Sequence, residues 1–95
     1  MDVIIDGEGI KSAKDFHTQF AKAFDIEQFY GKNLHALRDD LLGGLERPIH
    51  IIWTHSELSR KALGIEFTRI ISVFEEAKKD DEEFPSDERF TYELR

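Results

Sequence analysis

Histidines and carboxylates are the side chains of this sequence with the most chemical potential, so their spacing is the starting point. His35 and Asp39 are four residues apart in a segment of helical pattern, so they share one face and can form half of a metal site. No H-E-x-x-H pattern completes such a site, and His17, His50 and His55 occupy unrelated positions. We therefore expect these histidines at the surface or at an element's edge, and we expect no metal site.

The sequence also lacks the motifs of phosphate binding and covalent catalysis. Its glycines form neither G-x-G-x-x-G nor G-x-x-x-x-G-K-[ST], and its serines lack a G-x-S-x-G elbow. The absence of cysteine excludes thiol nucleophiles, thiolate zinc sites and disulfides. Carboxylate pairs occur by chance in an acidic chain, so they do not by themselves predict an enzyme. We expect no catalytic residue and no cofactor.

The length of the chain indicates the number of domains, and its net charge indicates which kinds of partner are favoured. The chain has 95 residues, 13 Lys plus Arg against 20 Asp plus Glu, and a formal net charge of -7. This length predicts one domain over residues 1–95, and eight Phe and one Trp can fill its core. The negative charge disfavours nucleic acid and anionic membranes and favours a basic protein partner. No basic leader and no apolar run of about 20 residues is present, so a cytoplasmic location is expected.

The elements that must position these side chains can be predicted from apolar periodicity. Three strands are predicted, within Met1–Gly7, over Ile49–Thr54 and over 90–94. Four helices are predicted, over about 13–24 and 34–42, over Ser56–Leu63 and around Phe67–Ala77. A solvated acidic loop is expected over 80–88, before the last strand. Helices between strands favour a parallel sheet. The predicted class is therefore α/β, a three-stranded parallel sheet with about four helices packed against it.

Several residues are typical of helix ends. Ser12 with Asp15 resembles a capping box, and Asn33 and Ser56 are predicted N-caps. Gly43 and Gly64 are predicted to end helices.

The second predicted helix combines an apolar stripe with a polar outer face. Leu34, Leu37 and Leu41 recur at helical spacing and are expected to pack on the core. Five other residues are then expected to be largely exposed: Lys32, His35, Arg38, Asp39 and Leu42. A solvated helix face is the ordinary explanation of such a pattern.

The stretch from Phe29 to Gly43 resembles the barstar family, intracellular inhibitors of small secreted bacterial ribonucleases. That family has an aromatic-Tyr-Gly-x-Asn-Leu-x-Ala-Leu-x-Asp segment at this point of the chain. The matching residues here are Tyr30, Gly31, Asn33, Leu34, Ala36, Leu37 and Asp39. The early strand ending in Asp6-Gly7, Pro48 before an apolar strand, and the Val73–Ala77 segment are similar too.

The resemblance implies a barstar-like fold and a mechanism. A ribonuclease site holds phosphate between cationic side chains, and an inhibitor can place a carboxylate there instead. By motif position that carboxylate belongs to Asp39, and Glu76 matches a second acidic contact. The residues expected to bind a partner are Phe29, Gly31, Asn33, His35, Arg38, Asp39, Leu42, Gly43 and Glu76.

Three departures from the best-known family member concern the partner. An acidic residue is replaced by His35, and two aromatic residues are replaced by Arg38 and Gly44. Aromatic anchors often dominate interface energy, and a guanidinium disfavours a basic site. The resemblance therefore implies an inhibitor, immunity protein or antitoxin for a basic ribonuclease or nuclease toxin domain that differs from the usual one. The alternatives are a barstar-like adaptor for a non-nuclease protein and a small enzyme or metal protein.

Overall fold

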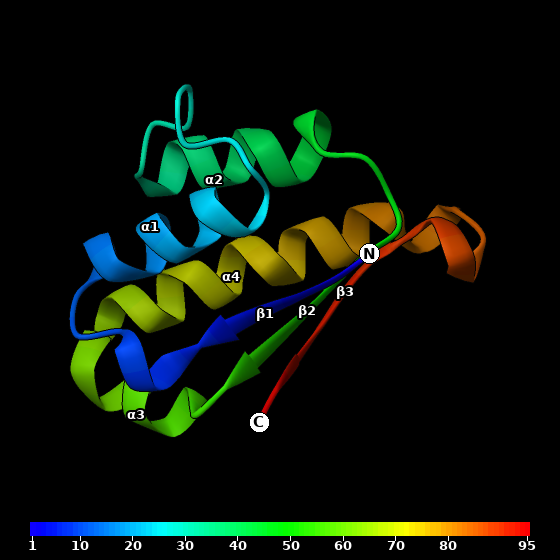
Figure 1. Ribbon diagram of the computed structural model, residues 1–95. Helices are drawn as coiled ribbons and strands as arrows, with labels where there is room; N and C mark the ends of the chain where they lie inside the picture. The colour runs from blue at the N-terminus through cyan, green and yellow to red at the C-terminus, as the bar shows by residue number, and fades with distance from the viewer.

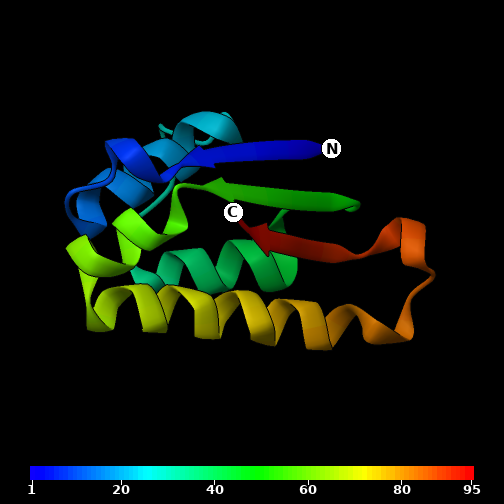
Figure 2. The ribbon, with the colours of Figure 1, turned by 90° about the horizontal axis from the view of Figure 1, so that it is seen from below.

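A three-stranded parallel sheet forms one layer of the protein, and α1, α2 and α4 lie on one side of it (Figure 1). In this computed structural model, which describes residues 1–95, the strands are β1 (Asp2–Asp6), β2 (Ile49–Thr54) and β3 (Phe90–Leu94). Their order is β1-β2-β3, and Val3 of β1 lies opposite Ile51 of β2, which lies opposite Tyr92 of β3. All three strands end on the side of the molecule where α3 lies (Figure 2). The predicted α/β class is confirmed.

Four helices and four short helical turns connect the strands. The helices are α1 (Ala13–Ala23), α2 (Leu34–Asp39), α3 (Ser56–Leu63) and α4 (Ile65–Asp80). The short turns are η1 (Gly7–Gly9), η2 (Asp40–Gly44), η3 (Asp81–Glu83) and η4 (Ser86–Glu88). Helix α1 packs against β1, α4 against β3, and α2 against α4. No helix combines the length and apolar composition needed to cross a bilayer.

The strands bury one face of the sheet. Val3 and Ile5 of β1 are buried, whereas Ile4 between them is 64% exposed. Trp53 of β2 is fully buried and stacks on Phe16 of α1, with 5.0 Å between ring centroids. Burial of these large side chains is the main favourable contribution to folding.

The predicted helix ends are confirmed at Asn33 and Gly64 but not at Ser56. The Asn33 side chain accepts a hydrogen bond from the Ala36 N–H at 2.8 Å, and Gly64 ends α3 with a φ of +58°. Ser56 is not the N-cap of α3: His55 occupies that position, in the left-handed region, without a side-chain capping bond. The Ser56 hydroxyl instead donates to the Arg95 carbonyl at 3.0 Å, which ties α3 to the end of β3.

The end of the second helix differs from the prediction. Helix α2 stops at Asp39, and the chain continues as the π-helical turn η2, closed by the Leu45 N–H donating to the Asp40 carbonyl at 3.0 Å. Gly43 lies within this turn and has no positive φ, so it is not a glycine cap. Arg47 donates to the Leu41 and Leu45 carbonyls, so a side chain satisfies acceptors that a glycine cap usually leaves to backbone N–H groups.

The acidic segment 80–88 is also more structured than a solvated loop. Helix α4 includes Asp80, and the next residue, Asp81, is only 4% exposed. The Asp81 carboxylate accepts hydrogen bonds from Arg47 Nε at 2.8 Å and from the Phe90 N–H at 2.7 Å. A buried carboxylate requires such partners, and these two lie beyond the reach of a local sequence pattern.

The prediction for His17 is also wrong, because His17 is buried and not at the surface. It is 3% exposed, and its Nδ1 lies 2.7 Å from the Tyr30 hydroxyl. Burial lowers the pKa of His17, since the protonated ring loses hydration, although Glu66 opposes this effect. The same burial, together with Asp40, raises the pKa of Tyr30. The neutral pair anchors the segment before α2 to α1.

Replacing Asp81 with Asn should destabilise the protein strongly. The substitution keeps an acceptor for the Phe90 N–H but leaves the half-buried Arg47 guanidinium without its counter-charge. Breaking a buried pair in this way costs about 3 kcal/mol of unfolding free energy. Urea unfolding followed by circular dichroism measures the change.

Asp87→Asn is the matched control, because Asp87 is exposed in the same acidic segment. Its unfolding midpoint should stay close to that of the unmodified protein. Equal midpoints for the two variants would show that the Arg47–Asp81 pair contributes no net stability.

Because His17 is neutral in the folded protein, the free energy of unfolding should decrease in acid. Its pKa in the folded protein is lower than the ordinary value of 6.5, so the unfolded chain binds the proton more readily. The contribution of His17 is therefore complete above pH 6.5 and decreases as the pH falls toward the lowered pKa. Urea midpoints between pH 7.5 and 5 should fall more steeply for the unmodified protein than for His17→Asn, which does not titrate. Parallel curves would contradict this assignment.

Candidate functional site

The predicted binding residues gather where α2 packs against α4. Leu37 and Leu41 are fully buried, which fixes the rotation of this segment and places Arg38 and Asp39 outside. Glu76 of α4 lies next to Arg38. We call the surface formed by His35, Arg38, Asp39 and Glu76 the α2–α4 face.

A bidentate ion pair crosses this face. Arg38 Nε donates to Glu76 Oε1 at 3.1 Å, and Arg38 Nη2 donates to Glu76 Oε2 at 2.6 Å. This contact, with the nearby carboxylates of Asp39 and Asp80, raises the pKa of Arg38. Both oxygens of Glu76 thus have a guanidinium partner within the protein, although about half of each side chain remains exposed.

Asp39 is the carboxylate of α2 that has no such partner. Its side chain is 61% exposed, and Oδ2 lies 3.5 Å from Nε2 of His35, one helical turn earlier. Asp39 is therefore the carboxylate of the α2–α4 face that has no arginine or lysine bonded to it.

The acid next to it, Asp40, has a different environment. It is half-buried at the start of η2, and burial followed by repulsion from Asp39 raises the pKa of its carboxyl group. The sequence pattern did not separate the two neighbours. The turn geometry separates them, because it directs Asp39 to solvent and Asp40 toward the chain.

The segment before α2 has an exposed aromatic ring, Phe29, next to a buried residue, Tyr30, that holds the segment in place. Phe29 is 77% exposed, whereas Tyr30 is 6% exposed and bonded to His17. Gly31 lies where a Cβ atom would come within 3.1 Å of the Ala36 Cβ, so a larger residue would push against the first turn of α2. Asn33 connects Gly31 to α2, because its side chain caps α2 and donates to the Gly31 carbonyl at 3.3 Å.

The last two predicted residues lie beyond the helix. Leu42 is half-buried and packs against the core, so only part of its side chain is accessible. Gly43 is exposed, and no atom would come within 4 Å of a Cβ placed there. The structure thus brings together three pairs of predicted residues: Arg38 with Glu76, His35 with Asp39, and Gly31 with Asn33. Leu42 and Gly43 form no polar bond with the side chains of these pairs.

Arg47 is a positioning residue that the motif did not reveal. It holds the end of η2 through the Leu41 and Leu45 carbonyls and joins it to Asp81 at the end of α4. This fixes the relative placement of the two elements that form the α2–α4 face. The available signals were only an arginine before a proline and an aspartate within an acidic run, and neither is specific.

The chemistry available on this face is recognition of a cation. A free carboxylate can accept bidentate hydrogen bonds from a partner guanidinium. A metal would have only His35 and Asp39 as paired ligands here, and a group of three possible ligands occurs elsewhere, at Asp6, Glu8 and His55.

Comparison with known proteins identifies a family and a relative of this chain. A family described as "Barstar (barnase inhibitor)" matches residues 1–93. A protein of Bacillus subtilis (strain 168), named "Putative ribonuclease inhibitor YrdF", is 30% identical over 78 residues, which cover 82% of this chain and 86% of that protein. Both matches point to an inhibitor and not to an enzyme. The chain belongs to the barstar family of barnase inhibitors.

Proposed function

We propose that this protein inhibits a ribonuclease by placing the Asp39 carboxylate in the phosphate-binding part of the enzyme's active site. The barstar family supports the general role, and the exposed, unneutralised Asp39 at the end of α2 is the observation that supports the mechanism. Such a site holds its phosphate with cationic side chains, which can bind a carboxylate through charge-assisted hydrogen bonds. We expect the other eight residues predicted to bind a partner to contribute around this contact.

The distribution of charge specifies the kind of ribonuclease. From Phe29 to Gly44 the chain has two acidic side chains, Asp39 and Asp40, and two basic ones, Lys32 and Arg38. Glu76, the second acidic contact of the family pattern, is bonded to Arg38. The interface therefore relies on one concentrated carboxylate and needs no arginine of the enzyme opposite Glu76.

The biological setting follows from the same mechanism. A cell that makes a ribonuclease toxin must block copies that remain in its cytoplasm, and an acidic protein with net charge -7 is attracted to a basic enzyme. We assign the protein to this cytoplasmic immunity or antitoxin role.

One observation favours a second candidate function. The internal Arg38–Glu76 pair makes the α2–α4 face less acidic than a free Glu76 would, and a less acidic face suits an adaptor for a non-nuclease protein. Affinity capture with the purified chain distinguishes the two, because an adaptor would retain a non-nuclease protein and leave ribonuclease activity unchanged.

Replacing Asp39 with Ala should abolish most of the affinity for the enzyme. Loss of one partner from a charge pair that binding buries costs about 2–5 kcal/mol, because a cation of the enzyme is left unpaired. We expect dissociation constants for barnase, measured by isothermal titration calorimetry, to rise by roughly thirtyfold or more.

Asp87→Ala is the control, since Asp87 is an exposed acid outside the α2–α4 face. It should change the affinity by less than about threefold. If Asp39→Ala binds barnase as tightly as the control does, Asp39 is not the inhibitory carboxylate. If the unmodified chain inhibits neither barnase nor any other secreted ribonuclease of that class, the proposed function is wrong.

Replacing Arg38 with Ala should instead strengthen binding. The substitution removes a positive charge and releases both oxygens of Glu76 for an arginine of the enzyme. We expect barnase to bind roughly threefold to tenfold more tightly at low salt, with a smaller gain at high salt because screening weakens the released charge.

Arg69→Ala provides a matched comparison, because Arg69 forms an exposed pair with Glu66 on the same helix at 2.9 Å. Its removal should leave barnase affinity nearly unchanged. Weaker binding by Arg38→Ala would show that Arg38 contacts an acidic group of the enzyme.

A further inference from the structure

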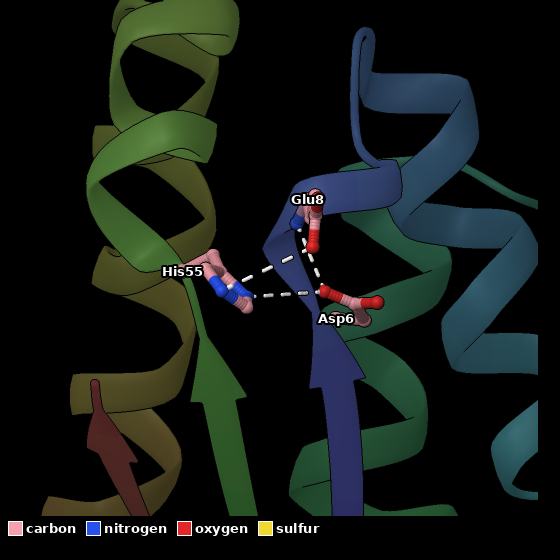
Figure 3. A group of neighbouring side chains, drawn as sticks. All are labelled: Asp6, Glu8 and His55. Carbon is pink, nitrogen blue, oxygen red and sulfur yellow. Dashed lines mark hydrogen bonds and ion pairs between the residues drawn. The ribbon is translucent and has the colours of Figure 1, made fainter.

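We propose that Asp6, Glu8 and His55 form a binding site for a divalent transition-metal ion of the zinc class. Figure 3 shows the three side chains directed toward one another, from the end of β1, the turn η1 and the residue after β2. Their ligand atoms all lie within 4.8 Å of one another. None of the three belongs to the predicted partner-binding set, so this site is independent of ribonuclease inhibition.

The three ligand atoms lie farther apart than ligands of a bound ion. With one ligand atom from each residue, the atoms are within 4.8 Å of one another. The two shorter contacts use different ring nitrogens, His55 Nδ1 with Asp6 Oδ1 at 3.4 Å and His55 Nε2 with Glu8 Oε2 at 3.9 Å, and an ion binds only one of these nitrogens. Ligands about 2.0–2.2 Å from a zinc ion are roughly 3–3.5 Å apart from each other. More than half of each of these side chains is exposed, so small torsional changes can close the remaining gap.

The backbone beneath the site is fixed by contacts outside it. A Cβ atom at Gly7 would lie 2.4 Å from the His55 carbonyl oxygen, so this approach of η1 to the end of β2 requires glycine. Gln19 accepts from the Asp6 N–H and donates to the Asp6 carbonyl, both at 2.9 Å. Ser59 donates to the Gly7 carbonyl at 3.3 Å. The ligands therefore extend from a preformed scaffold, which lowers the entropic cost of binding.

The other histidines lack this arrangement. His35 has one carboxylate, that of Asp39. His50 has the Glu93 carboxylate at Nε2 and the Thr91 hydroxyl at Nδ1, so it has one carboxylate within reach. His17 is buried against Tyr30. Only His55 has two carboxylates within reach.

The ligand set selects the class of ion. One imidazole with two carboxylates suits zinc and related transition ions, whereas calcium and magnesium prefer sites made of oxygen ligands. At neutral pH the two carboxylates place negative charges beside each other, and a bound cation relieves their repulsion. Water would complete the coordination, since the protein supplies three ligands on an open surface.

The test is a zinc chloride titration of the untagged, full-length protein at pH 7.5, followed by calorimetry and by the NMR signals of the histidine rings. We expect one saturable site per chain and a selective shift of the His55 ring. His55→Ala and Asp6→Asn should each weaken zinc binding by roughly tenfold or more. Lowering the pH to 5.5 should weaken it as well, because protons compete for the imidazole.

His50→Ala is the matched control, since it removes a histidine that pairs with a single carboxylate. It should bind zinc as the unmodified protein does. The proposal is wrong if zinc does not saturate a site at micromolar concentrations, if His55→Ala retains full affinity, or if magnesium chloride binds equally well. All substituted positions are exposed or half-buried, so circular dichroism should show native folding for each variant.

Discussion

The buried ion pair between Arg47 and Asp81 is the constraint on which the functional surface depends. Its two side chains lie 34 positions apart and join the end of η2, the end of α4 and the first residue of β3. Burying two charges is costly, and the cost is offset only because both groups have several hydrogen-bond partners. The pair fixes the position of these elements. It holds α2 against α4 and therefore determines where Asp39 lies relative to Glu76. A surface that must match the active site of an enzyme benefits from this rigidity, since less ordering remains to be done on binding.

The negative charge of the chain is not concentrated on the segment that contains α2. Ten of the twenty acidic side chains follow Gly64, outside the segment from Phe29 to Gly44. That segment is itself neutral, and Arg38 satisfies Glu76 internally. Under the proposed function, the overall charge speeds the approach to a basic enzyme, and the affinity comes from a few contacts around Asp39. Family membership supports the general role of an inhibitor, and the contacts of Asp39 are the proposed part.

Local patterns predicted most of the fold and only part of the site. Apolar periodicity located the strands and helices because each buries one face, as Val3, Ile5 and Phe16 do. The spacing of Leu34, Leu37 and Leu41 located α2, and its role in binding stays a prediction. Local patterns failed where contacts connect distant segments: the burial of His17 against Tyr30 and of Asp81 against Arg47. The group of Asp6, Glu8 and His55 was missed for the same reason, since only the pairing of β1 with β2 brings His55 to the others.

The central claim is that Asp39 occupies the place of the substrate phosphate, and the mode of inhibition tests it most directly. Initial rates of RNA cleavage by a secreted ribonuclease that the protein inhibits, barnase or another enzyme of its class, should be measured at several concentrations of the protein and of RNA. The account predicts strictly competitive inhibition, in which saturating RNA restores the full maximal rate, and in which inorganic phosphate competes with the protein for the enzyme. Inhibition that lowers the maximal rate at saturating RNA, with no effect of phosphate, would contradict the claim because the protein would then bind outside the phosphate site.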